Sequence, residues 1–279
     1  MLSVDTAISR FRWGVTFGSM LKGLLLAAAA ASLMLNLVTG RHGADGTVLL
    51  FIVAGVWMVL SYRSVKGSRL AAQSPSLIAS GHYDEAELQI EQALTSFSIF
   101  RTAKLLSLHH LALLRHAQKR WQETALLCRT LLGQRLGTLQ SLNKPSRLIL
   151  ADALLEMGDT LGAYHAIAGL HSQRLSLAET TNLLLVQLHY EASIGAWDRM
   201  FGGGVVQKVE LAELLPSTNA ARAQAFLALA AHKRGRPDWA AWLRRRAELL
   251  AEVPDICADR PILSELWAKA PVTRGDINQ

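Results

Sequence analysis

The sequence has little cysteine and none of the short motifs that mark common catalytic centres. Cys128 and Cys257 are the only cysteines in 279 residues, which excludes both a paired metal-binding motif and the disulfide framework of a small secreted domain. A reducing compartment suits two isolated cysteines. The sequence also lacks GxSxG, HExxH and CxxC patterns and a phosphate-binding loop ending in Lys and Ser or Thr. We therefore expect a protein that is not an enzyme and holds no cofactor or metal.

Acidic residues are fewer than basic ones, 22 against 29, giving a formal charge of +7 and a pI near 9.7. Such a balance fits nucleic-acid binding or retention on the cytoplasmic side of a membrane. The densest basic group, Arg244, Arg245 and Arg246, lies near Trp239 and Trp242. No second basic cluster or base-stacking platform accompanies it, so we expect a solvated face or contact with anionic lipid and no nucleic-acid binding.

Apolar residues make up 51% of the chain and gather near its N-terminus. Residues 13–39 are largely apolar and carry a single charge, on Lys22, whose long side chain can reach the membrane surface, and residues 47–62 carry no charge. A helix needs roughly 20 such residues to cross a membrane, and the second run is short but sufficient. The glycine-containing stretch 40–46 separates the runs. The pattern predicts a transmembrane helical hairpin.

Basic residues flank the predicted hairpin on the side of both chain ends. The turn between the runs holds only Arg41, whereas the flanks hold Arg10, Arg12, Lys22, Arg63, Lys66 and Arg69. The positive-inside rule then predicts a two-pass protein of a bacterial inner membrane with both termini in the cytoplasm. The alternative is a cleaved signal peptide, but the N-terminal region is long for one and lacks a clean small-x-small site.

Beyond residue 69 a helix-turn-helix pattern recurs. The successive turns lie 38, 39, 37 and 40 residues apart, and small residues dominate the positions five after and seven before each turn start. One helical pair cannot bury its apolar face alone, whereas stacked pairs share a continuous core. The turns begin at Gly81, Lys119, Gly158, Gly195 and Gly235.

The clearest copy, Gly81-His82-Tyr83-Asp84-Glu85-Ala86 with Leu88, Ile90, Ala93 and Leu94, resembles the turn and second helix of a tetratricopeptide repeat. The likeness covers residues 69–250. It departs from that family in its longer period, in the scarcity of closing prolines and in its degenerate later turns. Two membrane helices followed by helical repeats are also similar in architecture to the HemY-type membrane proteins linked to haem biosynthesis, although no residue motif is shared.

The resemblance implies a concave groove for a peptide or helix with an apolar stripe. In that family the groove is lined by fixed positions of each first helix. Carried onto this chain, those positions give Leu106, His109, Leu113, His116, Leu148, Asp152, Leu155, Arg222, Leu229 and His232. The alternative is that the leucines belong to the core.

Two further patterns allow a functional reading. His109 and His116 share one helix face, as metal ligands can, but have no carboxylate or cysteine beside them, so surface or groove histidines are favoured. Glycines 202–204 follow no apolar strand, which favours a loop over a phosphate cradle. That loop predicts a short second helix in the fourth pair, before a helix at 209–215. Beyond it we expect a capping helix at 262–269 and a disordered tail at 272–279.

Together these patterns predict an all-α protein with a membrane anchor at 1–66, a tetratricopeptide-like α-solenoid of about five hairpins at 67–252, and a capping helix with a tail at 253–279. The predicted function is that of a non-catalytic membrane-anchored scaffold that binds protein partners. The alternative is an assembly subunit of a larger membrane complex, in which Gly18, Gly23 and residues 27–31 allow close approach of other helices.

Overall fold

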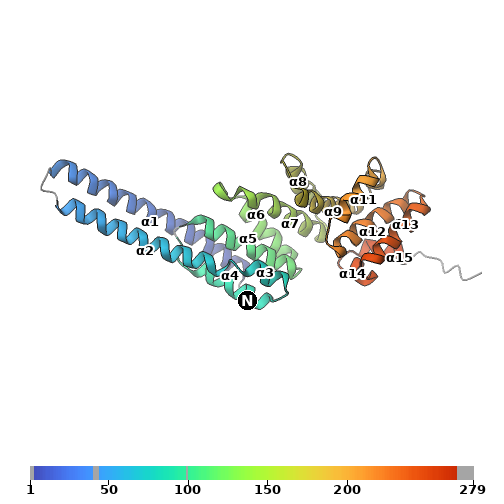
Figure 1. The fold of residues 1–279 in the computed structure, drawn as a ribbon, viewed down its shortest axis with the longest axis horizontal. Coiled ribbons are helices and arrows are strands. Elements are labelled where there is room, and N and C mark those ends of the chain that lie inside the picture. The colour runs from blue at the N-terminus through green and yellow to red at the C-terminus, as the bar shows by residue number, and fades with distance from the viewer. Residues whose placement is uncertain (1–2, 40–43, 99, 269–279) are drawn as a thin grey trace, which may run out of the picture. The chain divides into compact units, whose positions relative to one another are not determined.

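The computed structural model describes residues 3–39, 44–98 and 100–268, in which all regular secondary structure is helical. The chain divides into two compact units, Met1–Ile149 and Leu150–Gln279. Figure 1 labels most of the helices. They are α1 (Val4–Thr39), α2 (Ala44–Leu70), α3 (Ser74–Ala79), α4 (Tyr83–Thr95), α5 (Arg101–Ala117), α6 (Trp121–Leu132), the 3-10 helix η2 (Gly137–Leu142), α7 (Asn143–Glu156), α8 (Thr160–His171), α9 (Leu177–Ser193), α10 (Trp197–Phe201), α11 (Val205–Glu213), α12 (Ser217–Lys233), α13 (Pro237–Leu250), α14 (Val253–Cys257) and α15 (Pro261–Ala268).

Helices α1 and α2 run side by side as a hairpin (Figure 1). From Val4 to Ser32, where the burial of α1 is described, a series of buried residues recurs every seven positions: Val4, Phe11, Gly18, Leu25 and Ser32. A seven-residue spacing keeps one seam of a helix on its partners, as in coiled coils. The two helices contain the stretches Val4–Met34 and Thr47–Val65, which are long and apolar enough to cross a membrane. This agrees with the predicted pair of apolar helices.

The first turns of α1 belong to the core of the first unit. Ala7, Ile8 and Phe11 are buried, and α1 contacts α4, α5 and α6 as well as α2. The sequence pattern gave no sign of this, because Arg10 and Arg12 interrupt the apolar residues. One continuous helix therefore joins the globular part of this unit to the hairpin.

All five predicted turns are present and share one backbone geometry. The turn-start residues Gly81, Lys119, Gly158, Gly195 and Gly235 have φ between 60° and 81°. The next residue in each case donates its N–H to the carbonyl five residues earlier, at 2.8–2.9 Å, and the second helix begins at the residue after that. This bond and the left-handed residue define the Schellman closure, which satisfies carbonyls at a helix end.

The small-residue positions around these turns are buried, as the close crossing of two helices requires. They are Ala86, Thr124, Ala163, Met200 and Ala240 after the turns, and Ser74, Ala112, Ala151, Leu188 and Ala228 before them.

The second unit is built around α12, which contacts α9, α10, α11, α13, α14 and α15. Its alanines are fully or almost fully buried, and Phe226 and Leu229 lie among them at zero exposure. Alanine is the smallest residue with high helix propensity, so several neighbours can approach α12 closely without breaking it. The helix is apolar nearly all round because protein surrounds it.

The predicted interruption in the fourth pair is confirmed. Helix α10 has five residues and ends before Gly202, and α11 begins at Val205 after Gly204, whose φ is 88°. The helix expected at 209–215 thus starts four residues earlier. The expected capping helix is α15, while the predicted disordered tail at 272–279 lies outside the described residues.

Candidate functional site

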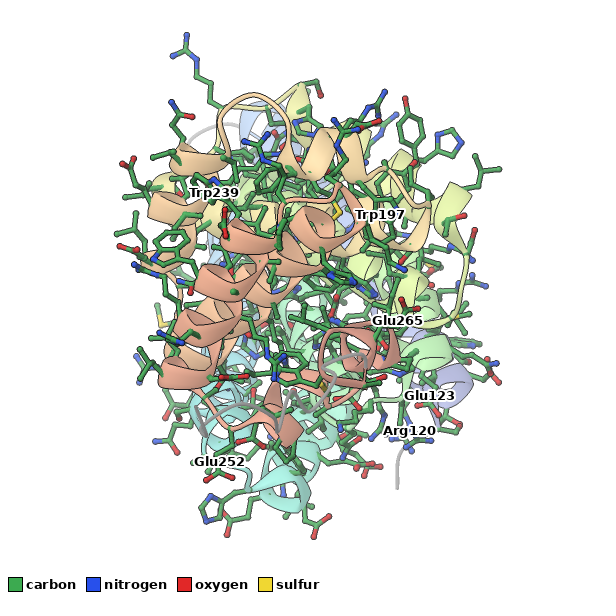
Figure 2. All side chains as sticks on the ribbon, turned by 90° about the vertical axis from the view of Figure 1, so that its right-hand side faces the viewer. Arg120, Glu123, Trp197, Trp239, Glu252 and Glu265 are labelled. Atoms are coloured by element: carbon green, nitrogen blue, oxygen red, sulfur yellow. The ribbon has the colours of Figure 1, made fainter. Side chains whose placement is uncertain are left out.

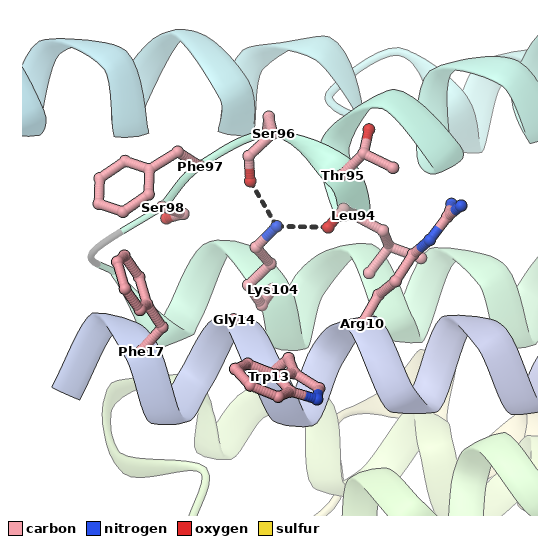
Figure 3. Close-up of a pocket in the computed structure, with 10 residues that line it drawn as sticks. All are labelled: Arg10, Trp13, Gly14, Phe17, Leu94, Thr95, Ser96, Phe97, Ser98 and Lys104. Atoms are coloured by element: carbon pink, nitrogen blue, oxygen red, sulfur yellow. Dashed lines mark hydrogen bonds between the residues drawn. The ribbon is translucent and has the colours of Figure 1, made fainter. Parts of the chain in front are cut away.

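A buried lysine marks the junction between the hairpin and the helices of the first unit. Lys104 lies in the first turn of α5 with 3% of its surface exposed. Its Nζ donates hydrogen bonds to the carbonyls of Leu94 at 2.5 Å, Ser96 at 2.6 Å and Ala93 at 3.2 Å (Figure 3 draws the first two). The last carbonyls of a helix have no partner within the helix. Lys104 therefore caps the end of α4 with a cation, the charge that this end favours.

Burial lowers the pKa of Lys104 to about 8. The ammonium has three N–H donors for its three carbonyl acceptors, whereas the neutral amine has two, so these bonds favour the charged form. The site therefore holds a desolvated positive charge at neutral pH.

An apolar cleft of about 370 Å³ lies beside this lysine (Figure 3). Trp13 and Phe17 of α1 line it, and Phe17 meets Phe97 edge to face at 6.2 Å. Trp13 is 72% exposed, although a tryptophan of a soluble domain buries most of its ring. At the cleft's edge Arg10 binds Glu91 at 3.0 Å, so this arginine contributes little net charge.

A second cavity, of about 160 Å³, adjoins the cleft and shares Gly14, Ser98 and Lys104 with it. Its other lining residues are Val15, Gly18, Ser19, Lys22 and Arg101. Three of the described lining residues are cationic and none is acidic. Lys22 Nζ lies 5.6 Å from the centre of the Phe100 ring, and Arg101 donates to Gln134 Oε1 at 2.7 Å. The cavity therefore combines a floor of small residues with concentrated positive charge.

The predicted groove residues fall into three groups by exposure. Leu106, Leu113, His116, Leu148, Asp152 and Arg222 are half-buried, and His232 is exposed. His109, Leu155 and Leu229 are buried and are not offered to a partner in this conformation. The leucine-as-core alternative thus holds for Leu155 and Leu229.

His109 and His110 form a buried pair in α5 rather than a surface feature. The Nδ1 of His109 lies 3.0 Å from Ser146 Oγ, and that of His110 lies 2.9 Å from Ser74 Oγ. Burial and, to a smaller extent, the neighbouring His110 together lower the pKa of His109 to about 4. Burial also lowers the pKa of His110. Both rings are neutral at pH 7 and fasten α5 to neighbouring segments.

A polar cluster in the second unit was missed by sequence reasoning. Asp152, Glu156 and His189 each bring a potential ligand atom within 4.8 Å of the others. Arg260 occupies this cluster: it binds Asp152 at 2.8 Å and also pairs with Glu156. Its guanidinium neutralises the carboxylates that a cation would need, so the arrangement acts as a tie between α7 and the segment before α15. These residues lie up to 108 positions apart in the sequence, so their spacing does not predict that they meet.

The three arginines of α13 are placed differently from one another. Arg244 binds Glu248 at 2.9 Å, and Arg246 pairs with Glu213 and lies over the Trp242 ring, while Arg245 is exposed. Trp239, labelled in Figure 2, meets Trp242 edge to face at 5.4 Å. Two of the three charges are therefore paired within the second unit.

The chain matches no protein-family model, no curated protein and no solved structure. Its function must therefore be argued from the residues themselves.

Proposed function

We propose that this chain is a non-catalytic membrane-anchored scaffold, held by the α1–α2 hairpin at the cytoplasmic face of a bacterial inner membrane. Its helical domain binds protein partners through tetratricopeptide-like hairpins. Anchoring raises the local concentration of a partner at the membrane and orients it, without making or breaking bonds.

The observation that carries the proposal is the exposure of apolar side chains on both helices of the hairpin. Only 17% of the apolar window of α1 and 6% of that of α2 are buried. Phe51, Met58, Leu24 and Met34 are each at least 65% exposed. A core helix of a soluble protein would hide these side chains, and an exposed patch of this extent marks an interface or a lipid surface. A signal peptide would account for α1 alone.

The binding part of the proposal rests on α5 of the first unit. Leu106, Leu113 and His116 fall on one face of this helix and remain partly exposed. The shared Schellman closures and buried small-residue positions support a series of similar hairpins.

Site-specific photo-crosslinking in cells tests the binding surface without disturbing the core. A photoreactive phenylalanine analogue replaces Leu113 in one full-length variant and Leu88 in a control, since Leu88 lies on α4 and is 57% exposed. We expect a discrete crosslinked protein from position 113 and none from position 88. Equal diffuse labelling from both positions would contradict binding at α5.

A second candidate function is an assembly subunit that uses the hairpin itself as its interface. Side chains built at Gly23 and Gly55 would meet nothing within 4 Å, so these glycines leave room for another helix to pack closely. Photo-crosslinks from the exposed positions Leu33 and Ile52, in the absence of crosslinks from position 113, would favour this reading over the scaffold.

A further inference from the structure

We infer that the cavity lined by Lys22, Arg101 and Lys104 binds the phosphate headgroup of an anionic glycerophospholipid. The inference rests on the proposed membrane anchoring and adds a ligand to it. Its basis is the joining of a cationic cavity to an apolar cleft at one end of the hairpin.

The charge of the cavity is not balanced by the residues that surround it. Lys22, Arg101 and Lys104 line it, and the described lining residues include no carboxylate. The nearby Arg10 is already paired with Glu91. The Nε–H of Arg101 is buried without an acceptor, and an unsatisfied buried donor is costly. A bound anion would balance the charge of these cations and could accept the Arg101 Nε–H, which would lower the cost of leaving that donor unsatisfied.

The size and walls of the cavity fit a phosphate group. Its volume is about 160 Å³, and Gly14, Gly18, Ser19 and Ser98 contribute short or absent side chains. Small residues let a ligand approach the backbone closely. Lys and Arg are the side chains that recognise phosphate, Lys as a point charge and Arg through its planar fork.

The apolar cleft provides a place for the rest of a lipid. It adjoins the cavity through Gly14, Ser98 and Lys104 and is lined by Trp13, Phe17 and further apolar side chains. Figure 3 shows the Trp13 and Phe17 rings on α1 beside Lys104. A free phosphate ion would make no use of this aromatic wall. A phospholipid would place its phosphate on Lys22 and Arg101, since the three N–H groups of Lys104 already bond to carbonyls. Its headgroup would lie along the aromatic wall of the cleft, and its acyl chains would follow the exposed apolar side chains beyond Lys22.

The position along α1 matches the membrane boundary. The cavity lies between Gly14 and Lys22, just before the charge-free stretch 23–39. Amphipathic aromatics and snorkelling lysines concentrate at this level of a bilayer. Anionic lipids of the cytoplasmic leaflet attract basic residues there.

Native mass spectrometry of the full chain in a neutral detergent tests the inference. Phosphatidylglycerol, phosphatidylcholine or inorganic phosphate is added at equal concentrations. We expect one phosphatidylglycerol to stay bound at a concentration at least tenfold below that needed for phosphatidylcholine. The double variant Lys22→Gln/Arg101→Gln should weaken phosphatidylglycerol binding by at least tenfold. Lys104 is left unchanged because it caps α4.

The matched control is Arg12→Gln/Arg63→Gln, which removes the same charge at exposed positions outside the cavity. It should leave phosphatidylglycerol binding within about twofold, since screened surface charges contribute little. Equal binding of the two lipids, an equal loss in both double variants, or displacement of the lipid by equimolar inorganic phosphate would each overturn the inference. If the chain stays in membranes after carbonate washing but shows no lipid preference, the headgroup site is refuted and the proposed membrane anchor is not.

Discussion

Two alanine-rich helices of this protein meet opposite environments. Residues 27–31 of α1 are five consecutive alanines that are exposed or half-buried, whereas the alanines of α12 are all buried. Helix α12 is surrounded by six other helices, whereas only 17% of the apolar window of α1 is buried. A helix that is apolar all round belongs in a core or in a membrane. Helix α12 lies in a protein core and α1 exposes most of its apolar surface, and composition alone does not separate the two.

Protein core and hairpin also differ in their charged residues. In the first unit Arg115 is fully buried and forms two bonds to Glu87, at 3.0 and 3.2 Å, with Glu123 also 3.1 Å away. In the hairpin, by contrast, residues 23–39 carry no charge at all. Protein can compensate a buried charge with a partner, whereas lipid offers none.

Breaking the buried ion pair should give the largest effect. Arg115→Met leaves Glu87 buried and uncompensated, so the free energy of unfolding should fall by about 3–5 kcal/mol. Arg135→Met removes an exposed arginine of the same unit and should change it by less than about 0.5 kcal/mol. Denaturant unfolding of the full chain in detergent measures both. Similar losses in the two variants would contradict the buried network.

Enlarging one alanine in each helix sharpens the comparison itself. Ala228→Leu forces extra methyl groups into a fully packed site and should cost about 1–3 kcal/mol. Ala30→Leu adds them to an exposed position of α1, where apolar volume meets detergent or lipid, and should cost less than about 0.5 kcal/mol. Thermal unfolding followed by circular dichroism reports the difference. Equal costs would mean that α1 is as tightly enclosed as α12.

Acidification should weaken the helical domain through its buried histidines. The folded-state pKa of His109 is about 4, below its unfolded value near 6.5, so the unfolded chain binds more protons between these values. Stability is then fully present above pH 6.5 and falls on acidification by at most about 1.4 kcal/mol per pH unit for this residue. His109→Gln should reduce that slope, and the exposed His232→Gln should not. Unfolding curves at pH 5 and 7.5 provide the test.

The smallest expected effect is a gain in the free energy of unfolding when the second turn is changed. Lys119 has φ of 60° where the other four turns have glycine, and a side chain costs about 1 kcal/mol in that conformation. Lys119→Gly should therefore raise the free energy of unfolding by up to about 1 kcal/mol, and the reverse change Gly158→Ala should lower it by a similar amount. A loss of stability on Lys119→Gly would show that the lysine side chain contributes more than its backbone strain costs.

Sequence reasoning predicted the all-helical fold, the apolar pair and all five turns, because each depends on local signals: glycine before a helix, uncharged runs and small residues at fixed offsets. It missed the start of α1 in the core, the Arg115 network and the tie from Arg260 to Asp152. These depend on which distant helices meet. Of the junction site, Lys22 was noted as a snorkelling residue, but Lys104 and Arg101 were not found. Lys104 and Arg101 reach the site because the end of α4 lies over the start of α5. The spacing of residues along the sequence does not indicate that contact.

Cysteine accessibility in intact spheroplasts tests most directly the central claim that the hairpin crosses the membrane with both ends inside. Single cysteines replace His42 between the two runs and Arg135 in the first unit, in a chain carrying Cys128→Ser and Cys257→Ser. A membrane-impermeant maleimide should label position 42 from outside, and position 135 only after the membrane is permeabilised. Labelling of position 135 in intact spheroplasts, or release of the chain by carbonate washing, would contradict the account.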